Sequence, residues 1–66
     1  MTTAQIQAQT GKTVYEIARA AGVPAQRIYH YLAGRSGLSL EVATRVARAA
    51  GVPLDVLATW RGQKKQ

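Results

Sequence analysis

Apolar residues recur at helical spacing just after the first ten residues of the chain. They fall at positions i, i+3, i+4 and i+7, the pattern of a helix with one buried stripe. These residues are Val14, Ile17, Ala18 and Ala21. Thr13 and Glu16 have the spacing of a capping box, in which each side chain satisfies a backbone amide at a helix start. Gly22 suits the left-handed conformation that ends a helix, so the pattern predicts a helix between Thr13 and Gly22.

A second short helix is predicted directly afterwards. Pro24 suits a first helical turn, where its missing N–H is harmless, and Gly34 suits a helix end. Three residues between them have the spacing of a buried helical stripe. They are Ile28, Tyr31 and Leu32. We therefore predict a helix over residues 24–33 with a polar outer face.

The remaining segments are predicted to support these two helices. A first helix is expected near Thr3 to Gln9, with Ile6 as its core residue. Ser39 has the position of an N-cap for a helix from Leu40 to Ala50. Small and apolar residues are expected to face inward from that helix. They are Ala43, Val46, Ala47 and Ala50.

Size and charge narrow the class of protein. A chain of 66 residues forms one small domain with a modest core, and without Cys it has neither disulfides nor thiolate metal sites to stabilise it. We expect the domain at residues 1–62 and a flexible basic tail at 63–66. The formal net charge of +6 favours polyanionic partners, nucleic acid before lipid, because the Arg residues do not line a face opposite large apolar groups.

The two helices around Gly22 resemble the helix-turn-helix of the Cro and phage-repressor family, also called XRE-like regulators. The matching positions are Ala18, Gly22, Val23, Ile28 and Tyr31. Ala18 is small, as two helices that approach closely through a short turn require. The segments from Gly34 to Val52 follow the family's next helices in order. The resemblance implies an all-α, four- to five-helix lambda-repressor-like domain that binds double-stranded DNA and regulates transcription.

The resemblance implies that helix 24–33 reads base edges in the major groove. The candidate base contacts are Ala25, Gln26, Arg27, Tyr29 and His30. Gln26 has the donor and acceptor that pair with adenine, and Ala25 can contact a thymine methyl group. Arg27 suits either guanine or a phosphate, and the tyrosine and histidine can donate to bases or backbone. Gln26 and Arg27 also have the alternative of being ordinary solvated helix residues.

Four residues are candidate phosphate contacts. They are Lys12, Thr13, Arg35 and Ser36. Lys12 precedes a capped helix start, where free amides and the helix dipole favour an anion, although a solvated loop lysine is an equal alternative. In the family, the loop that holds Arg35 runs along the DNA backbone. Val14 stands where many family members have Gln, and Pro24 where many have a capping Ser.

One heptapeptide occurs twice, as Ala18–Pro24 and as Ala47–Pro53. Apolar and acidic residues follow the second copy, and since phosphates repel acids and apolar groups favour burial, we assign DNA reading to the first copy. The apolar residues of the last helix are expected in a homodimer interface. They are Leu54, Leu57 and Trp60. The alternative is that Trp60 closes the monomer core.

Other chemistry has little support in the sequence. Ser36 and Ser39 have no base nearby, and neither a Gly-rich phosphate loop nor a carboxylate pair is evident, so we expect no enzyme and no cofactor. His30 lacks companions for a metal site. No apolar run approaches the roughly twenty residues of a membrane span, and no secretion signal is evident. We expect a cytoplasmic, nucleoid-associated protein of bacterial or phage origin.

The expected partner is an operator in double-stranded DNA, bound by a homodimer whose half-sites lie about 34 Å apart. No small-molecule effector is expected. The main alternative is a small helical protein-interaction module, or an antitoxin-like protein that binds a partner. Such a module would share the fold and the apolar last helix but would not need an excess of positive charge. RNA binding is a further alternative, weakened by the lack of an aromatic stacking platform beyond Tyr29.

Overall fold

Five helices and no strand make up residues 2–61, the part of the chain that the computed structural model describes. They are α1 (Thr3–Thr10), α2 (Val14–Ala21), α3 (Ala25–Leu32), α4 (Leu40–Ala50) and α5 (Leu54–Ala58). The all-α fold is therefore confirmed, and the first helix extends one residue beyond the predicted range. The basic tail predicted at 63–66 lies outside the described residues.

Helix ends follow the predicted capping residues. At α2, the Thr13 hydroxyl oxygen accepts from the N–H of Glu16 (3.1 Å) and Glu16 Oε1 accepts from the N–H of Thr13 (2.9 Å). Ser39 Oγ accepts from the N–H of Val42 (3.2 Å) at the start of α4. α3 begins after Pro24 with no side-chain cap, as predicted. A similar capping box of Thr2 and Gln5, which was not predicted, starts α1.

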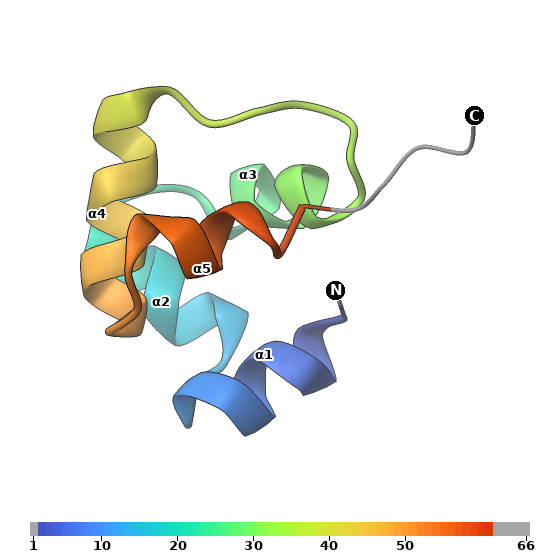
Figure 1. Ribbon diagram of the computed structural model, residues 1–66, viewed down its shortest axis with the longest axis vertical. Helices are drawn as coiled ribbons and strands as arrows, with labels where there is room; N and C mark the ends of the chain where they lie inside the picture. The colour runs from blue at the N-terminus through green and yellow to red at the C-terminus, as the bar shows by residue number, and fades with distance from the viewer. Residues whose placement is uncertain (1, 62–66) are drawn as a thin grey trace.

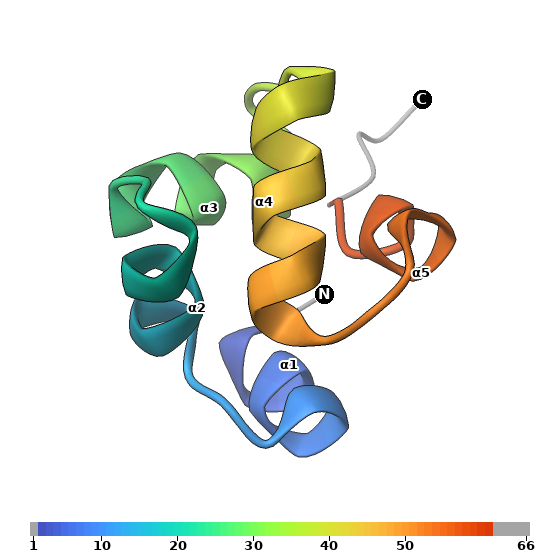
Figure 2. The ribbon, with the colours of Figure 1, turned by 90° about the vertical axis from the view of Figure 1, so that its left-hand side faces the viewer.

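The helices are arranged around the packed pair of α2 and α4. Figure 2 shows α3 and α5 on the two sides of α4, with α1 below them. α4 packs most extensively on α2, and α2 also packs on α3 and α1. The segment 33–39 leaves α3 and crosses the top of the molecule to reach α4 (Figure 1). This arrangement leaves one side of α3 uncovered.

The core collects the apolar face of every helix. Its buried residues are Ile6, Val14, Ile17, Ala18, Ala21, Ile28, Tyr31, Leu32, Val46, Ala47, Ala50, Leu57 and Trp60. Every inward residue predicted for α2 and α3 is buried, and so is Ile6. On α4, the predicted Ala43 is half-buried and packs against this core.

Two of the three residues predicted for a dimer interface lie in this core instead. Leu57 is 2% exposed and Trp60 is 0% exposed, and Trp60 Nε1 donates to Gln9 Oε1 at 2.8 Å. The chain after α5 thereby closes onto the end of α1. Because their side chains are already covered within one chain, the prediction that Leu57 and Trp60 contribute to a dimer interface is wrong. Leu54, at 41% exposure, is the predicted interface residue that remains at the surface.

Tyr31 connects α3 to α5. Its hydroxyl donates to the backbone carbonyl of Leu57 at 3.0 Å, across a separation of 26 residues. Burial raises the pKa of Tyr31 above its ordinary value of 10.0, an effect that the positive charge of Arg61 partly offsets. The hydrogen bond fixes the inner side of α3 and so helps to set which of its side chains point outward.

Candidate nucleic-acid interface

Gln26 points directly away from the core on α3. Successive residues of an α-helix are separated by about 100° around its axis. The buried residues Ile28, Tyr31 and Leu32 therefore centre on a direction that is about 180° from Gln26. Arg27 and His30 lie to one side of Gln26, and Ala25 and Tyr29 lie to the other. The outer face of α3 thus presents an amide flanked by polar groups.

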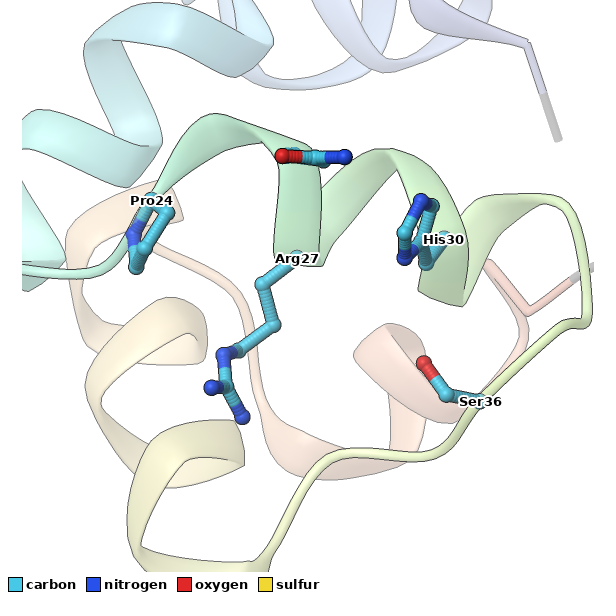
Figure 3. Close-up of a pocket in the computed structure, with 5 residues that line it drawn as sticks. Pro24, Arg27, His30 and Ser36 are labelled. Atoms are coloured by element: carbon cyan, nitrogen blue, oxygen red, sulfur yellow. The ribbon is translucent and has the colours of Figure 1, made fainter.

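A shallow hollow of about 410 Å³ lies on one side of this outer face, and we call it the Arg27 hollow. Its lining residues are Pro24, Gln26, Arg27, His30 and Ser36. Figure 3 shows Arg27 extending from α3 on the side where Ser36 lies, with His30 one turn further along the helix. Of the nine residues predicted to contact DNA, four meet in this hollow, namely Gln26, Arg27, His30 and Ser36.

The end of α3 places the loop that carries Ser36. Gly34 is buried and has a φ of 76°, a left-handed conformation that favours glycine. The N–H of Gly34 donates to the carbonyl of Tyr31 at 3.0 Å, and the N–H of Arg35 donates to that of His30 at 2.9 Å. These bonds stop the helix and turn the chain back along it. The side chains of Arg35 and Ser36 are exposed there.

The other predicted contacts lie outside the Arg27 hollow, at separate places on the surface. Ala25 is half-buried and packs against the core, whereas Tyr29 is 46% exposed. Lys12 is exposed in the turn before α2. The backbone N–H and the hydroxyl of Thr13 both contact Glu16, at 2.9 Å and 3.3 Å. A phosphate at Thr13 would therefore lie beside a carboxylate, which disfavours it relative to one at the Arg27 hollow.

Charge is distributed unevenly over the helices. The three acidic residues occupy the first turns of α2, α4 and α5, and α3 has none. In residues 2–61 the one ion pair joins Arg45 to Glu41 at 3.0 Å, on the exposed side of α4. Within that part of the chain, no carboxylate therefore pairs with Arg19, Arg27 or Arg35. These guanidinium groups are available to an anionic partner.

A second hollow, of about 280 Å³, lies between α2 and the start of α3, and we call it the Tyr15 hollow. Its lining residues are Tyr15, Ala18, Arg19, Val23, Pro24 and Ala25. Tyr15 and Arg19 stand four residues apart and are both exposed, and neither was predicted to contact a partner. That spacing on the side of α2 opposite its buried stripe is the signal that could have found them. Val14, in contrast, is 2% exposed and cannot reach a ligand.

Two general properties of the described residues bear on the choice of partner. Their longest helix, α4, has 11 residues, and none of their helices is long and apolar enough to cross a lipid bilayer. No cluster of three or more acidic or histidine side chains in residues 2–61 could hold a metal ion.

Comparison with known proteins identifies the family. Curated proteins and solved structures gave no significant match. The family described as "Helix-turn-helix domain" matches residues 4–60, which include all five helices except the first residue of α1. The match spans α2, α3 and the turn at Gly22 that joins them. The chain therefore belongs to the helix-turn-helix domain family, one of the XRE-like group.

Proposed function

We propose that the protein is a sequence-specific transcriptional regulator of the Cro and phage-repressor kind, which reads the DNA major groove with α3. The observation that carries this proposal is the outward direction of Gln26, with unpaired cations beside it and no acid on the same helix. An α-helix fits the major groove, and an amide side chain has the donor and acceptor that recognise adenine.

The side chains on α3 divide between bases and backbone. Gln26 would pair with an adenine, and Tyr29, which is exposed on the same helix, would contact the neighbouring base or sugar. Ala25, although half-buried, could touch a thymine methyl group at the edge of the contact. Arg27 and His30 lie beside Ser36 in the Arg27 hollow, where a phosphate is the partner that their charge and donors suit best.

We further propose that two copies of the protein bind a palindromic operator, with half-sites about 34 Å apart. Leu54 is the predicted interface residue that is exposed, so any contact between copies would centre there. The protein would act in the cytoplasm on nucleoid DNA and repress by occupying its operator, without a small-molecule effector. Binding rather than catalysis would then account for all of its activity.

The test is a binding titration of the full chain on duplex DNA at two salt concentrations. Sequences selected from a random pool serve as the specific ligand, and unselected duplex as the reference. A regulator should prefer selected sequences, and its affinity for both ligands should fall steeply with salt because bound counterions are released. Absence of binding to either ligand at low salt would favour the alternative, a helical protein-interaction module. Binding without enrichment of any sequence would contradict the sequence-specific role.

A further inference from the structure

We infer that the Tyr15 hollow is a second site for a DNA backbone phosphate, held by Arg19 and Tyr15. In this arrangement the Arg27 hollow holds a phosphate of one strand and the Tyr15 hollow a phosphate of the other. The inference rests on the proposed function, because it assumes that α3 enters the major groove. It adds two residues of α2 to the interface and assigns each hollow to its own strand.

The two hollows lie on opposite sides of the first turn of α3. They share Pro24, the residue that precedes the helix. Beyond it, the Tyr15 hollow contains Ala25, whereas the Arg27 hollow contains Arg27. Two residues of a helix differ by about 200° around its axis, so these residues face nearly opposite directions. Gln26, which also lines the Arg27 hollow, lies between Ala25 and Arg27 and faces outward.

This spacing suits the width of the major groove. The groove is about 12 Å wide, and a helix with its side chains is about 10 to 12 Å across. A helix that enters the groove therefore has one phosphate backbone at each flank. With Gln26 directed at the bases, the two hollows are the surfaces of this chain that meet those backbones.

The chemistry of the Tyr15 hollow fits a phosphodiester. Arg19 supplies a guanidinium that can form two hydrogen bonds to phosphate oxygens, and Tyr15, at 62% exposure, supplies a phenolic donor. Val23 and Ala25 provide apolar walls beside these donors. The carboxylate of Glu16, on the same helix, accepts hydrogen bonds from Thr13 and does not pair with Arg19.

The Tyr15 hollow also gives α2 a contact with the DNA backbone, which Val14 cannot provide. Val14 is the first residue of α2 and is buried, so its side chain cannot reach a phosphate. Tyr15 and Arg19 stand one and five residues further along and lie at the surface. A contact through these two residues would anchor α2 to the backbone without a polar side chain at the buried position.

The first test compares Arg19→Gln with Arg48→Gln. Arg48 occupies the same position in the second copy of the heptapeptide and is also exposed, but it lies in neither hollow. Both variants lose one positive charge. Arg19→Gln should weaken binding to selected and random duplex alike, on the order of ten-fold, and should reduce the slope of log affinity against log salt by about 0.9. Tyr15→Phe should weaken binding a few-fold with the slope unchanged.

The second test locates the phosphate on the DNA. Single phosphates of a selected duplex are replaced by uncharged methylphosphonates, and each duplex is titrated with the wild type, Arg19→Gln and Arg27→Gln. Each variant should lose its sensitivity at one phosphate position in each half-site, and within a half-site the two positions should lie on opposite strands. Coupling of both variants to the same strand of one half-site would overturn the inference, and so would equal behaviour of Arg19→Gln and Arg48→Gln.

The wild-type titration distinguishes failure of the proposed function from failure of the second phosphate site alone. If the wild type does not bind duplex DNA, the proposed function fails. If the wild type binds with steep salt dependence and the Arg19→Gln variant matches the Arg48→Gln control, only the second phosphate site fails. Far-UV circular dichroism of all variants checks that the helices are retained, which is expected because the substituted side chains are exposed.

Discussion

The two copies of the heptapeptide end their helices in the same way but lead into different helices. In Ala18–Pro24 and Ala47–Pro53 the glycine ends a helix in the left-handed conformation, with φ and ψ of 74° and 31° at Gly22 and of 76° and 29° at Gly51. In both copies the N–H of the following valine donates to the carbonyl of the first alanine at 3.0 Å. Identical residues therefore give an identical helix end in two places.

The residues that follow decide the role of each copy. After Pro24 the chain forms α3, whose outer face carries Gln26 and Arg27 and no acid. After Pro53 it forms α5, which has Asp55 in its first turn and turns Leu57 into the core. The turn is therefore a general connection between two helices, and the eight residues that follow it set the chemistry of the surface.

The largest effect is expected where the second copy leads into the core. Trp60→Ala should lower the free energy of unfolding by about 3 to 5 kcal/mol, because it empties a fully buried site and removes the hydrogen bond to Gln9. Urea denaturation followed by far-UV circular dichroism measures this change. Leu54→Ala, at an exposed position of the same segment, is the control and should cost much less. Equal costs for the two variants would break the assignment of this segment to packing.

For the helix that follows the first copy, we expect a substitution to change DNA recognition and to leave stability nearly unchanged. Gln26→Ala should leave stability nearly unchanged, because the side chain is exposed, but should reduce discrimination at one base pair by about 1 to 3 kcal/mol. Titration of selected duplexes, altered one base pair at a time, measures the loss. Arg35→Ala is the control and should weaken all sequences alike. An equal loss on selected and random DNA for Gln26→Ala would count against base reading.

The glycines test the identity of the two turns. Gly22→Ala and Gly51→Ala should each cost about 1 to 2 kcal/mol, because a side chain is strained at these positive φ values. A Cβ atom at either glycine would meet no other atom within 4 Å, so no steric clash adds to the strain of the backbone. Thermal or urea denaturation gives both costs. A difference larger than about 1 kcal/mol between them would show that the turns are not equivalent.

The smallest effect is expected for the hydrogen bond between Tyr31 and Leu57, which joins α3 to α5. Tyr31→Phe removes the hydroxyl that donates to Leu57 and should cost about 0.5 to 1.5 kcal/mol. Because burial raises the pKa of Tyr31, the folded state holds this proton more tightly than the unfolded chain. The stability of the wild type should therefore be intact below the ordinary pKa of 10.0 and decline as the pH rises above it.

Tyr31→Phe also provides the control for that pH dependence. Urea denaturation of both proteins on each side of the ordinary tyrosine pKa should show a smaller decline for the variant, because the other titrating groups are common to both. Parallel declines would mean that Tyr31 ionises equally in the folded and unfolded chains.

The helices were predictable because their signals are local. Capping residues, glycines and apolar spacing located α2, α3 and α4 to within a residue. Each of these features depends on residues fewer than about five positions apart, whose interactions are the same in any fold. The outward direction of Gln26 also follows from spacing alone.

The interface was only partly predictable from sequence. Four of the predicted contacts meet in the Arg27 hollow, where the loop after α3 brings Ser36 beside His30. The Tyr15 hollow was missed because its walls come from two helices. The angle between those helices does not follow from the sequence of either one. The roles of all nine predicted contacts stay predictions until DNA binding is measured.

The sequence by itself determined the helices, their ends, the inner and outer faces of α3, and the excess of positive charge. Tertiary structure alone decided whether the last apolar residues lie in the monomer core or at a dimer interface. Spacing shows that Leu57 and Trp60 avoid water, but a dimer interface and a monomer core satisfy that need equally. The choice required the end of α1, 51 residues away in the chain, to bring Gln9 to the indole N–H of Trp60.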